Sequence, residues 1–164
     1  MRLHLSPLLV ATALVALAGS ACASNSTELS QHGEELSADI DQSSGEDAHA
    51  QLDQHGQANA VALRQAGSAE ASLLQLGHGN GASLEQAGAA RAWLTQIGAY
   101  NSADLSQFGD NNNAALSQSG AANTIGLTQV GGDNSAFLSQ DGVGLQLLVT
   151  QLGGATITIS QGGP

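Results

Sequence analysis

The sequence has little of what an ordinary globular domain is built from. Aromatic residues make up 2% of its 164 residues and charged residues 10%, and there are two prolines and one cysteine. A packed core needs bulky apolar side chains to offset the conformational entropy lost on folding, and here such side chains are thinly spread. Low charge also argues against ordinary disorder, which combines low hydrophobicity with high net charge. The composition favours a repeat architecture instead.

Basic residues are nearly absent. Three Lys and Arg residues stand against 14 Asp and Glu, which argues against electrostatic binding to nucleic acid or anionic lipid. No charged side chain follows Asp141. Most of the acids crowd into the first part of the chain, at Glu28, Glu34, Glu35, Asp39, Asp41, Glu46, Asp47 and Asp53.

Residues 1–23 have the pattern of a secretory signal peptide. A short polar start precedes the apolar stretch Leu8 to Ala18, and Ala21-Cys22-Ala23 fits the small-x-small cleavage rule. Cleavage after Ala23 would leave no cysteine, and so no disulfide or thiol chemistry. Lipidation of Cys22 is the alternative, although the leucine usual three residues upstream is missing. We divide the remainder into an acidic segment, 24–47, with degenerate repeats and a repeat domain, 48–164.

A glutamine recurs every ten to twelve residues through this remainder, with an aliphatic residue two positions before each copy. Glycine stands two positions after nearly all of them, and Asn five positions after six of them. The thirteen copies are Gln31, Gln42, Gln54, Gln65, Gln75, Gln86, Gln96, Gln107, Gln118, Gln129, Gln140, Gln151 and Gln161. A motif repeated this often at this spacing specifies a repeated structural unit.

Within each unit the period is two, which predicts β-strands. In residues 101–107 one face shows Asn, Ala, Leu and Gln, whereas Ser102, Asp104 and Ser106 occupy the other face. The charged residues Arg64, Glu85, Arg91 and Asp104 all fall on the outward phase. Segments such as 98–101 and 131–134 contain Gly and Asn, which tolerate positive φ and therefore suit turns.

Two strands and two turns make a rung of about 22 residues, and stacked rungs make a β-solenoid. We expect Leu and Ala inside, with Gln and Asn stacked on their counterparts in neighbouring rungs, as amide ladders do in cross-β structures. Both ends then leave open strand edges, so the fold class is an all-β solenoid that becomes cross-β on polymerisation.

At these residues the sequence resembles the curlins, the subunits of bacterial curli fibres, whose repeat runs Ser-x5-Gln-x-Gly-x2-Asn-x-Ala-x3-Gln. Residues 96–107 match every Gln, Gly, Asn and Ala of that pattern. The opening Ser is replaced by Ala48, Ala69 and Ala90, or by Asn in later units. From residue 107 onward, consecutive units carry Asn112, Asn123 and Asn134, so the family's alternation of Asn is lost.

The resemblance implies a secreted structural subunit of an extracellular amyloid fibre (a fimbrium, or pilus) that serves biofilm matrix, adhesion and cell aggregation. It implies self-association, other curlin subunits and a dedicated outer-membrane secretion apparatus as partners. The irregular repeats leave two roles open, a major subunit and a minor subunit that nucleates growth. A second class of function is a monomeric solenoid that binds a surface, such as an ice-binding protein or adhesin, for which only Thr156-Ile-Thr158 offers a flat array.

The candidate site residues are therefore structural. The expected ladder comprises Gln54, Gln65, Gln75, Gln86, Gln96, Gln107, Gln118, Gln129, Gln140 and Gln151, with Asn59, Asn80, Asn101, Asn112, Asn123 and Asn134. The expected turn glycines are Gly56, Gly77, Gly98, Gly109, Gly120 and Gly131. The charge-free stretch 142–164 is a candidate growth edge.

Other residues suggest chemistry only weakly. His32, His49, His55 and His78 form no spaced ligand cluster, and we expect them in or near turns rather than on a metal. The acidic segment lacks the Gly-Gly-x-Gly-x-Asp pattern of calcium-binding solenoids. Its acids are expected either to be solvated surface charges or to act as gatekeepers that slow premature assembly.

By the alternation of the strands, Trp93 and Phe137 should point outward. No catalytic set lies in a plausible cleft, so we expect neither an enzyme nor a cofactor.

Overall fold

The computed structural model describes residues 2–5, 11–16, 24–42 and 47–163, and its regular structure there is entirely β-strand. The strands are β1 (Arg2–Leu5), β2 (Ala11–Ala16), β3 (Ser26–Glu34), β4 (Leu36–Asp41), β5 (His49–Gln57), β6 (Ala60–Ala66), β7 (Glu70–His78), β8 (Gly81–Ala87), β9 (Ala90–Ala99), β10 (Ser102–Phe108), β11 (Asn112–Ala121), β12 (Thr124–Val130), β13 (Ser135–Val143), β14 (Gln146–Leu152) and β15 (Thr156–Gly162). None of the described residues forms a helix long and apolar enough to cross a membrane.

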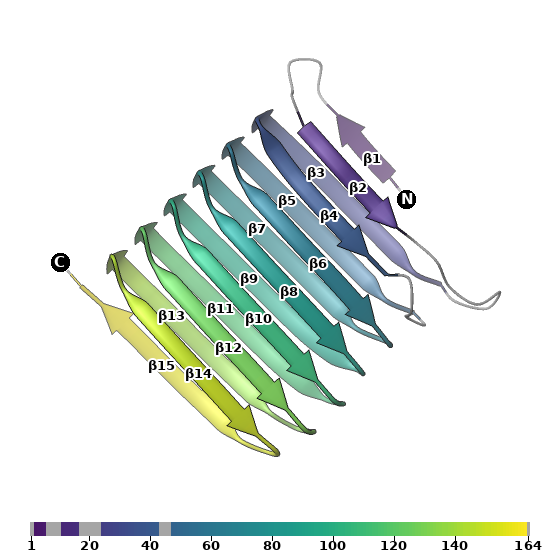
Figure 1. The fold of residues 1–164 in the computed structure, drawn as a ribbon, viewed down its shortest axis with the longest axis vertical. Coiled ribbons are helices and arrows are strands. Elements are labelled where there is room, and N and C mark those ends of the chain that lie inside the picture. The colour runs from purple at the N-terminus through teal and green to yellow at the C-terminus, as the bar shows by residue number, and fades with distance from the viewer. Residues whose placement is uncertain (1, 6–10, 17–23, 43–46, 164) are drawn as a thin grey trace.

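The strands form two parallel sheets, one of odd-numbered and one of even-numbered strands (Figure 1). Each strand pairs with the strands two before and two after it, so the chain crosses from one sheet to the other at every turn. From β3 and β4 onward, paired residues are 21 to 23 positions apart, and homologous residues align: Leu94, Leu116 and Leu138 stand in one row. The predicted solenoid with rungs of about 22 residues is confirmed.

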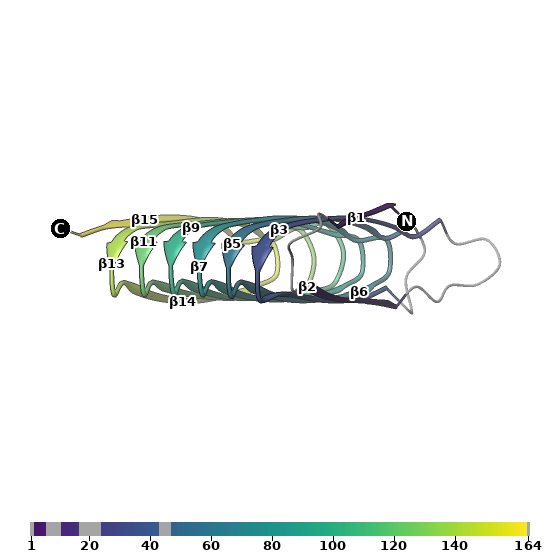
Figure 2. The ribbon, with the colours of Figure 1, turned by 90° about the horizontal axis from the view of Figure 1, so that it is seen from above.

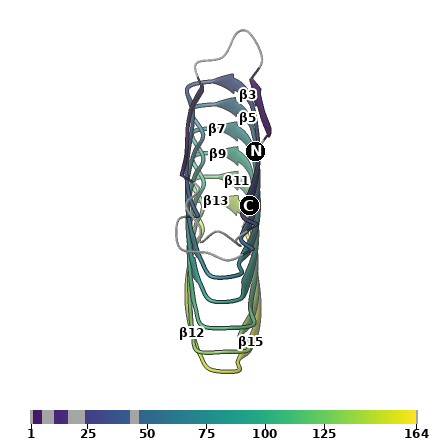
Figure 3. The same ribbon diagram turned by 90° about the vertical axis from the view of Figure 1, so that its right-hand side faces the viewer.

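The two sheets lie face to face, joined by turns at both edges (Figures 2 and 3). Strand alternation sends Ala, Leu and Gln between the sheets, so that Leu84, Leu94 and Leu105 are at most 2% exposed. Burial of each such leucine contributes about 1.5–3 kcal/mol. The four charged residues of the outward phase, from Arg64 to Asp104, are all exposed, as the phase predicts.

The first two strands lie where the sequence predicts a cleaved leader. Strand β1 pairs with β3, and β2 pairs with β4, so these segments add a rung at the N-terminal end of the stack. A parallel edge offers unpaired backbone groups to any extended segment, which explains why a segment outside the repeat is accepted there. The cleavage motif and Cys22 lie outside the described residues.

Candidate functional site

A continuous ladder of glutamine side chains runs through the odd-numbered sheet. The Nε2 of Gln54 donates to the Oε1 of Gln75 at 2.7 Å, and Gln75 donates to Gln96 at 2.8 Å. The series continues from Gln96 to Gln118 at 2.9 Å and from there to Gln140 at 3.1 Å. It begins at Gln31 and ends at Gln161.

The even-numbered sheet carries a second ladder of the same kind. It starts at Gln42, which donates to Gln65 at 2.7 Å. The other members are Gln86, Gln107, Gln129 and Gln151, joined by Nε2 to Oε1 distances of 2.7–3.0 Å. All members from Gln42 to Gln129 are 0% exposed, so these amides exchange hydrogen bonds away from water.

Most of the ladder amides, although not Gln31 or Gln140, also tie the two sheets together. Gln96 donates to the carbonyl of Gly81 at 2.9 Å, and Gln107 donates to the carbonyl of Arg91 at 3.1 Å; in both cases the carbonyl belongs to the opposite sheet. One N–H therefore follows the stack and the other bridges the sheets, while the oxygen accepts from the rung before. A primary amide has two donors and an acceptor, and this arrangement uses all three.

Every ladder bond points the same way along the stack, so its two ends differ. At the N-terminal end the buried Oε1 of Gln31 has no hydrogen-bond donor among the described residues. At the C-terminal end Gln161 is the last donor, and its Nε2 donates to the carbonyl of Gln146 at 3.3 Å. An unpaired buried acceptor costs about 1–3 kcal/mol. The ladder thus lacks one donor at its start.

The asparagines form two columns at opposite edges of the stack, because they lie in alternate turns. One column contains Asn59, Asn80, Asn101 and Asn123, in which each Oδ1 accepts the backbone N–H of the next member at 3.0–3.1 Å. The other contains Asn112 and Asn134, linked in the same manner at 3.2 Å. The apparent loss of alternation after residue 107 is the start of this second column.

The Asn side chains differ from the expected amide ladder. Within the described part of the chain, hydrogen bonds between two Asn side chains occur only in the pairs Asn80–Asn59 and Asn134–Asn112. Elsewhere the Nδ2 group donates to backbone carbonyls, as Asn101 does to Ile97 and Gly120. Asparagine therefore supplies the partners that turn backbone would otherwise lack.

The glycines expected in turns stand in register from rung to rung. Gly56, Gly77, Gly98 and Gly120 form one column, but each is the second-last residue of its strand and so lies just before the turn. Gly109 and Gly131 lie between strands, in the column at the other edge. All six have positive φ, between 93° and 122°. A Cβ on Gly77 would lie 2.0 Å from the carbonyl oxygen of Gly98. These positions need glycine because successive backbones pass too close for any side chain.

The turns hold non-glycine residues in the left-handed region too, at a cost in stability. Ala122 has a φ of 55°, whereas Gly79 and Gly144 occupy the equivalent position in their own turns at 66° and 68°. A left-handed L-residue costs about 1–2 kcal/mol, part of which the entropy of glycine offsets.

We therefore expect Ala122→Gly to raise the free energy of unfolding by about 0.5–1 kcal/mol. Its neighbour Ala121 ends strand β11 without a positive φ, so Ala121→Gly should lower stability instead. Urea denaturation followed by circular dichroism measures both changes. Equal effects of the two substitutions would contradict the backbone explanation.

His32, His49, His55 and His78 lie on the outer face of the odd-numbered sheet, each within two residues of a strand end and so near a turn. His32 stacks on His55 with ring centroids 4.9 Å apart, and His55 lies 2.9 Å from Asp53. His49 contacts the Ser26 hydroxyl, and the His78 ring meets Tyr100 edge-on. The described residues contain no group of three or more ligands able to hold a metal ion.

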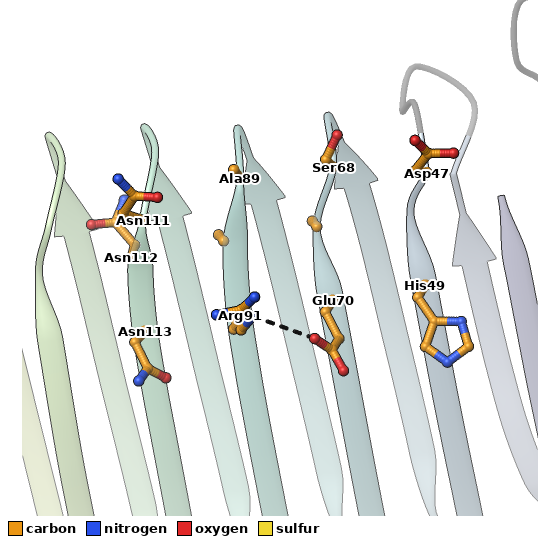
Figure 4. Close-up of a pocket in the computed structure, with 11 residues that line it drawn as sticks. Asp47, His49, Ser68, Glu70, Ala89, Arg91, Asn111, Asn112 and Asn113 are labelled. Atoms are coloured by element: carbon orange, nitrogen blue, oxygen red, sulfur yellow. Dashed lines mark ion pairs between the residues drawn. The ribbon is translucent and has the colours of Figure 1, made fainter. Parts of the chain in front are cut away.

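A polar hollow of about 380 Å³ lies beside the row His49, Glu70, Arg91 and Asn113 (Figure 4). These residues come from β5, β7, β9 and β11 in register. Arg91 pairs with Glu70 at 3.4 Å, and both side chains are at least half exposed. Pairs of this kind contribute little to stability. Ser68 and His49 both line the hollow, but no hydrogen bond joins them among the described residues, whereas acyl transfer needs a nucleophile held by its base.

Three segments of the chain match one known family. The curlin associated repeat matches residues 23–56, 92–120 and 120–153, more than half of the chain. The protein belongs to the curlin family. No curated protein and no solved structure matched it. The curlin repeat and the glutamine ladders coincide, since each matched segment contains at least two ladder residues. A curlin-type solenoid is a structural rather than a catalytic architecture.

Proposed function

We propose that this curlin is secreted after loss of residues 1–23 and polymerises end to end into an extracellular cross-β fibre of a biofilm matrix. Each incoming chain adds its first rung to the last rung of the chain before it. The ladders of glutamine set the register of the junction, since only one alignment continues them.

The incomplete ladder carries this proposal. Gln31 presents a buried acceptor without a donor at one end, and Gln161 presents amide hydrogens at the other. A second copy placed with its Gln161 beside Gln31 completes the ladder in the direction that all the internal bonds follow. The same contact pairs the exposed edges of β15 and β3, whose backbone groups would otherwise face water.

The leader supports the same reading. Strand β1 pairs with β3. The leader therefore occupies the strand edge that a second copy would need. Its removal exposes β3 and β4 to another copy, so that cleavage and readiness to polymerise would coincide.

Charge also favours stacking of unlike ends. The acids Glu28, Glu34, Glu35 and Asp39 lie exposed on the first rung, whereas no charge follows Asp141. Head-to-tail contact places the acidic rung against the uncharged one. Head-to-head contact would oppose two acidic rungs, which repel each other.

Cysteine cross-linking tests the junction. Ser30 and Ser160 directly precede the two terminal glutamines, so they should become neighbours across the junction of two copies. In mature protein (residues 24–164), Ser30→Cys with Ser160→Cys should give disulfide-linked chains on mild oxidation of fibres, because paired strands hold Cα atoms within disulfide range. The control, Ser30→Cys with Ser83→Cys on the other sheet, should give none. Equal cross-linking in both proteins would contradict the junction.

Fibre formation itself is the broader test. We expect a lag, then thioflavin-positive fibrils with a reflection at about 4.7–4.8 Å.

Seeding of the major curlin of the same organism would separate a nucleating role from a major one. A chain that stays monomeric for days would favour the surface-binding alternative. Against that alternative, the row of Thr156 and Thr158 continues into Ser135 and Phe137 rather than into further threonines.

A further inference from the structure

One asparagine of the buried columns is followed by glycine. The sequence contains a single Asn-Gly pair, Asn80-Gly81, where the turn between β7 and β8 ends. Because glycine has no Cβ, its backbone nitrogen is the least hindered of any residue. An Asn-Gly pair is therefore the sequence in which the backbone attacks the preceding side-chain amide most readily. A chemically reactive pair thus lies inside a structural column.

The reaction of this pair needs only water as a co-reactant. The Gly81 nitrogen loses its proton and forms a bond to Cγ of Asn80, and the bond from Cγ to Nδ2 breaks. Nδ2 takes up a proton and leaves as ammonia, and a five-membered cyclic imide remains. Water then opens the imide at either of its two carbonyl carbons, which gives aspartate or isoaspartate at position 80. In isoaspartate the main chain runs through the former side chain and is longer by one carbon.

The folded chain holds both reacting groups in hydrogen bonds. The Gly81 N–H donates to the carbonyl of Asn101 at 2.8 Å. The Nδ2 of Asn80 donates to the carbonyl of Gly98 at 3.0 Å and to the Oδ1 of Asn59 at 3.2 Å. Asn80 is 0% exposed, so water does not reach the amide. The reaction is therefore confined to chains in which this turn has opened or the whole chain has unfolded.

Neither product fits the column. The Oδ1 of Asn80 accepts the N–H of Asn101 at 3.1 Å, and one carboxylate oxygen would do the same. The second oxygen, in the place of Nδ2, would face three acceptors, the carbonyls of Leu76 and Gly98 and the Oδ1 of Asn59. A buried negative charge that faces acceptors is strongly disfavoured. Isoaspartate would add a main-chain atom between β7 and β8, which are both held in register by their neighbours.

We propose that Asn80-Gly81 is a site of spontaneous deamidation that folding closes, and that deamidated chains are excluded from the stack. A chain that stays unfolded loses its ability to fold as time passes, whereas a folded chain keeps its amide. The pair thereby limits how long an unfolded subunit remains usable. The reaction takes place within one chain, so this inference goes beyond the proposed fibre and does not depend on it.

A single tryptic peptide reports on the site. Cleavage after Arg64 and Arg91 releases residues 65–91, in which Asn80 is the one asparagine. In mature protein (residues 24–164), deamidation of this peptide is followed by mass spectrometry, with circular dichroism to establish which samples are folded. We expect deamidation to be at least about tenfold faster in guanidinium chloride than in buffer, because only opened turns react. Equal rates in the two solutions would overturn the protection by folding.

Four variants separate the reactivity of the pair from the exclusion of its product. Gly81→Ala has room for its Cβ, since nothing lies within 4 Å, and should fold normally but deamidate several-fold more slowly when unfolded. Asn80→Asp carries the product from the start and should not fold where the wild type does. Asn101→Asp, one rung along the same column, should fail in the same way, although Asn101 precedes serine and deamidates slowly. Ser102→Asp adds the same charge at the adjacent, exposed position and should fold as the wild type does.

Each remaining outcome decides one part of the proposal. Normal folding of Asn80→Asp would overturn the exclusion, and so would a failure of Ser102→Asp as complete as that of Asn80→Asp. When wild-type chains are aged unfolded and then refolded, the deamidated peptide should be several-fold enriched among the chains that stay unfolded. An equal share in folded and unfolded chains would overturn the exclusion too. Absence of fibres would contradict the proposed function alone, because deamidation is measured on single chains.

Discussion

Replacement of Gly98 by alanine should abolish the cross-β stack. The new Cβ would lie 2.0 Å from the carbonyl oxygen of Gly120, and φ at this position is 113°. Backbone cannot give way here as a flexible side chain could, because the same strands hold the glutamine ladder of the odd-numbered sheet in register. We expect a loss of more than about 4 kcal/mol, the range of exceptional single substitutions. Circular dichroism of fresh protein and thioflavin fluorescence after incubation would both show the loss.

Gly81 provides the matched control. It lies at the start of β8, its φ is not positive, and a Cβ there meets nothing within 4 Å. Gly81→Ala should therefore assemble at least as well as the wild type, because alanine restricts the unfolded chain more than glycine does. If Gly98→Ala assembled as readily as Gly81→Ala, the close approach of the glycine columns would not constrain the stack.

Replacement of Gln107 by alanine should have the second largest effect. Its Oε1 accepts from Gln86 at 2.9 Å, and its Nε2 donates to Gln129 at 2.8 Å and to the carbonyl of Arg91 at 3.1 Å. Loss of the amide leaves buried acceptors without donors and a cavity at a site that is 0% exposed. Together these should cost about 3–5 kcal/mol. The measurement is the concentration of protein that stays in solution at equilibrium with fibres. A tenfold rise in this concentration corresponds to a loss of about 1.4 kcal/mol in the free energy of assembly.

Two further variants separate the effect of the lost hydrogen bonds from the effect of the cavity. Ser106→Ala changes the neighbouring outward residue of the same strand and should alter this concentration less than about twofold, as surface substitutions do. Gln107→Leu fills the cavity but still leaves the Oε1 of Gln129 without its donor. An intermediate loss for leucine is expected, and a leucine variant as stable as wild type would show that the ladder bonds contribute no net stability.

The fold could be predicted from the sequence because residues alternate along each unit with the period of a β-strand, and the alternating sets differ in polarity. Alternation of apolar and polar residues specifies strands, and Gln107 with Leu105 shows which phase is buried. The outward placement of Trp93 and Phe137 followed from the same alternation and is confirmed by their exposure. Rung length followed from the distance between successive units on one sheet.

The details of the turns could not be predicted, since they depend on which backbone groups remain unpaired after stacking. Asn101 was expected to bond to other Asn side chains, yet its oxygen accepts the backbone N–H of Asn123. Glycine at position 98 was assigned to a turn of positive φ. The stronger reason, contact with Gly120 in the next rung, appears only when the rungs are stacked. The position of His49 at the start of a strand likewise depends on the register of the sheet.

The covalent path of the chain gives a fibre of such subunits two kinds of breakage. Inside one subunit, consecutive rungs are tethered through turns such as 98–101, so a rung pulled open stays beside its neighbour and can close again. At the contact between subunits nothing covalent crosses, and a separation there persists. Mechanical shear should therefore cut fibres between subunits, and each cut leaves two fresh tips that can recruit more protein. Agitation would then multiply growth instead of destroying material.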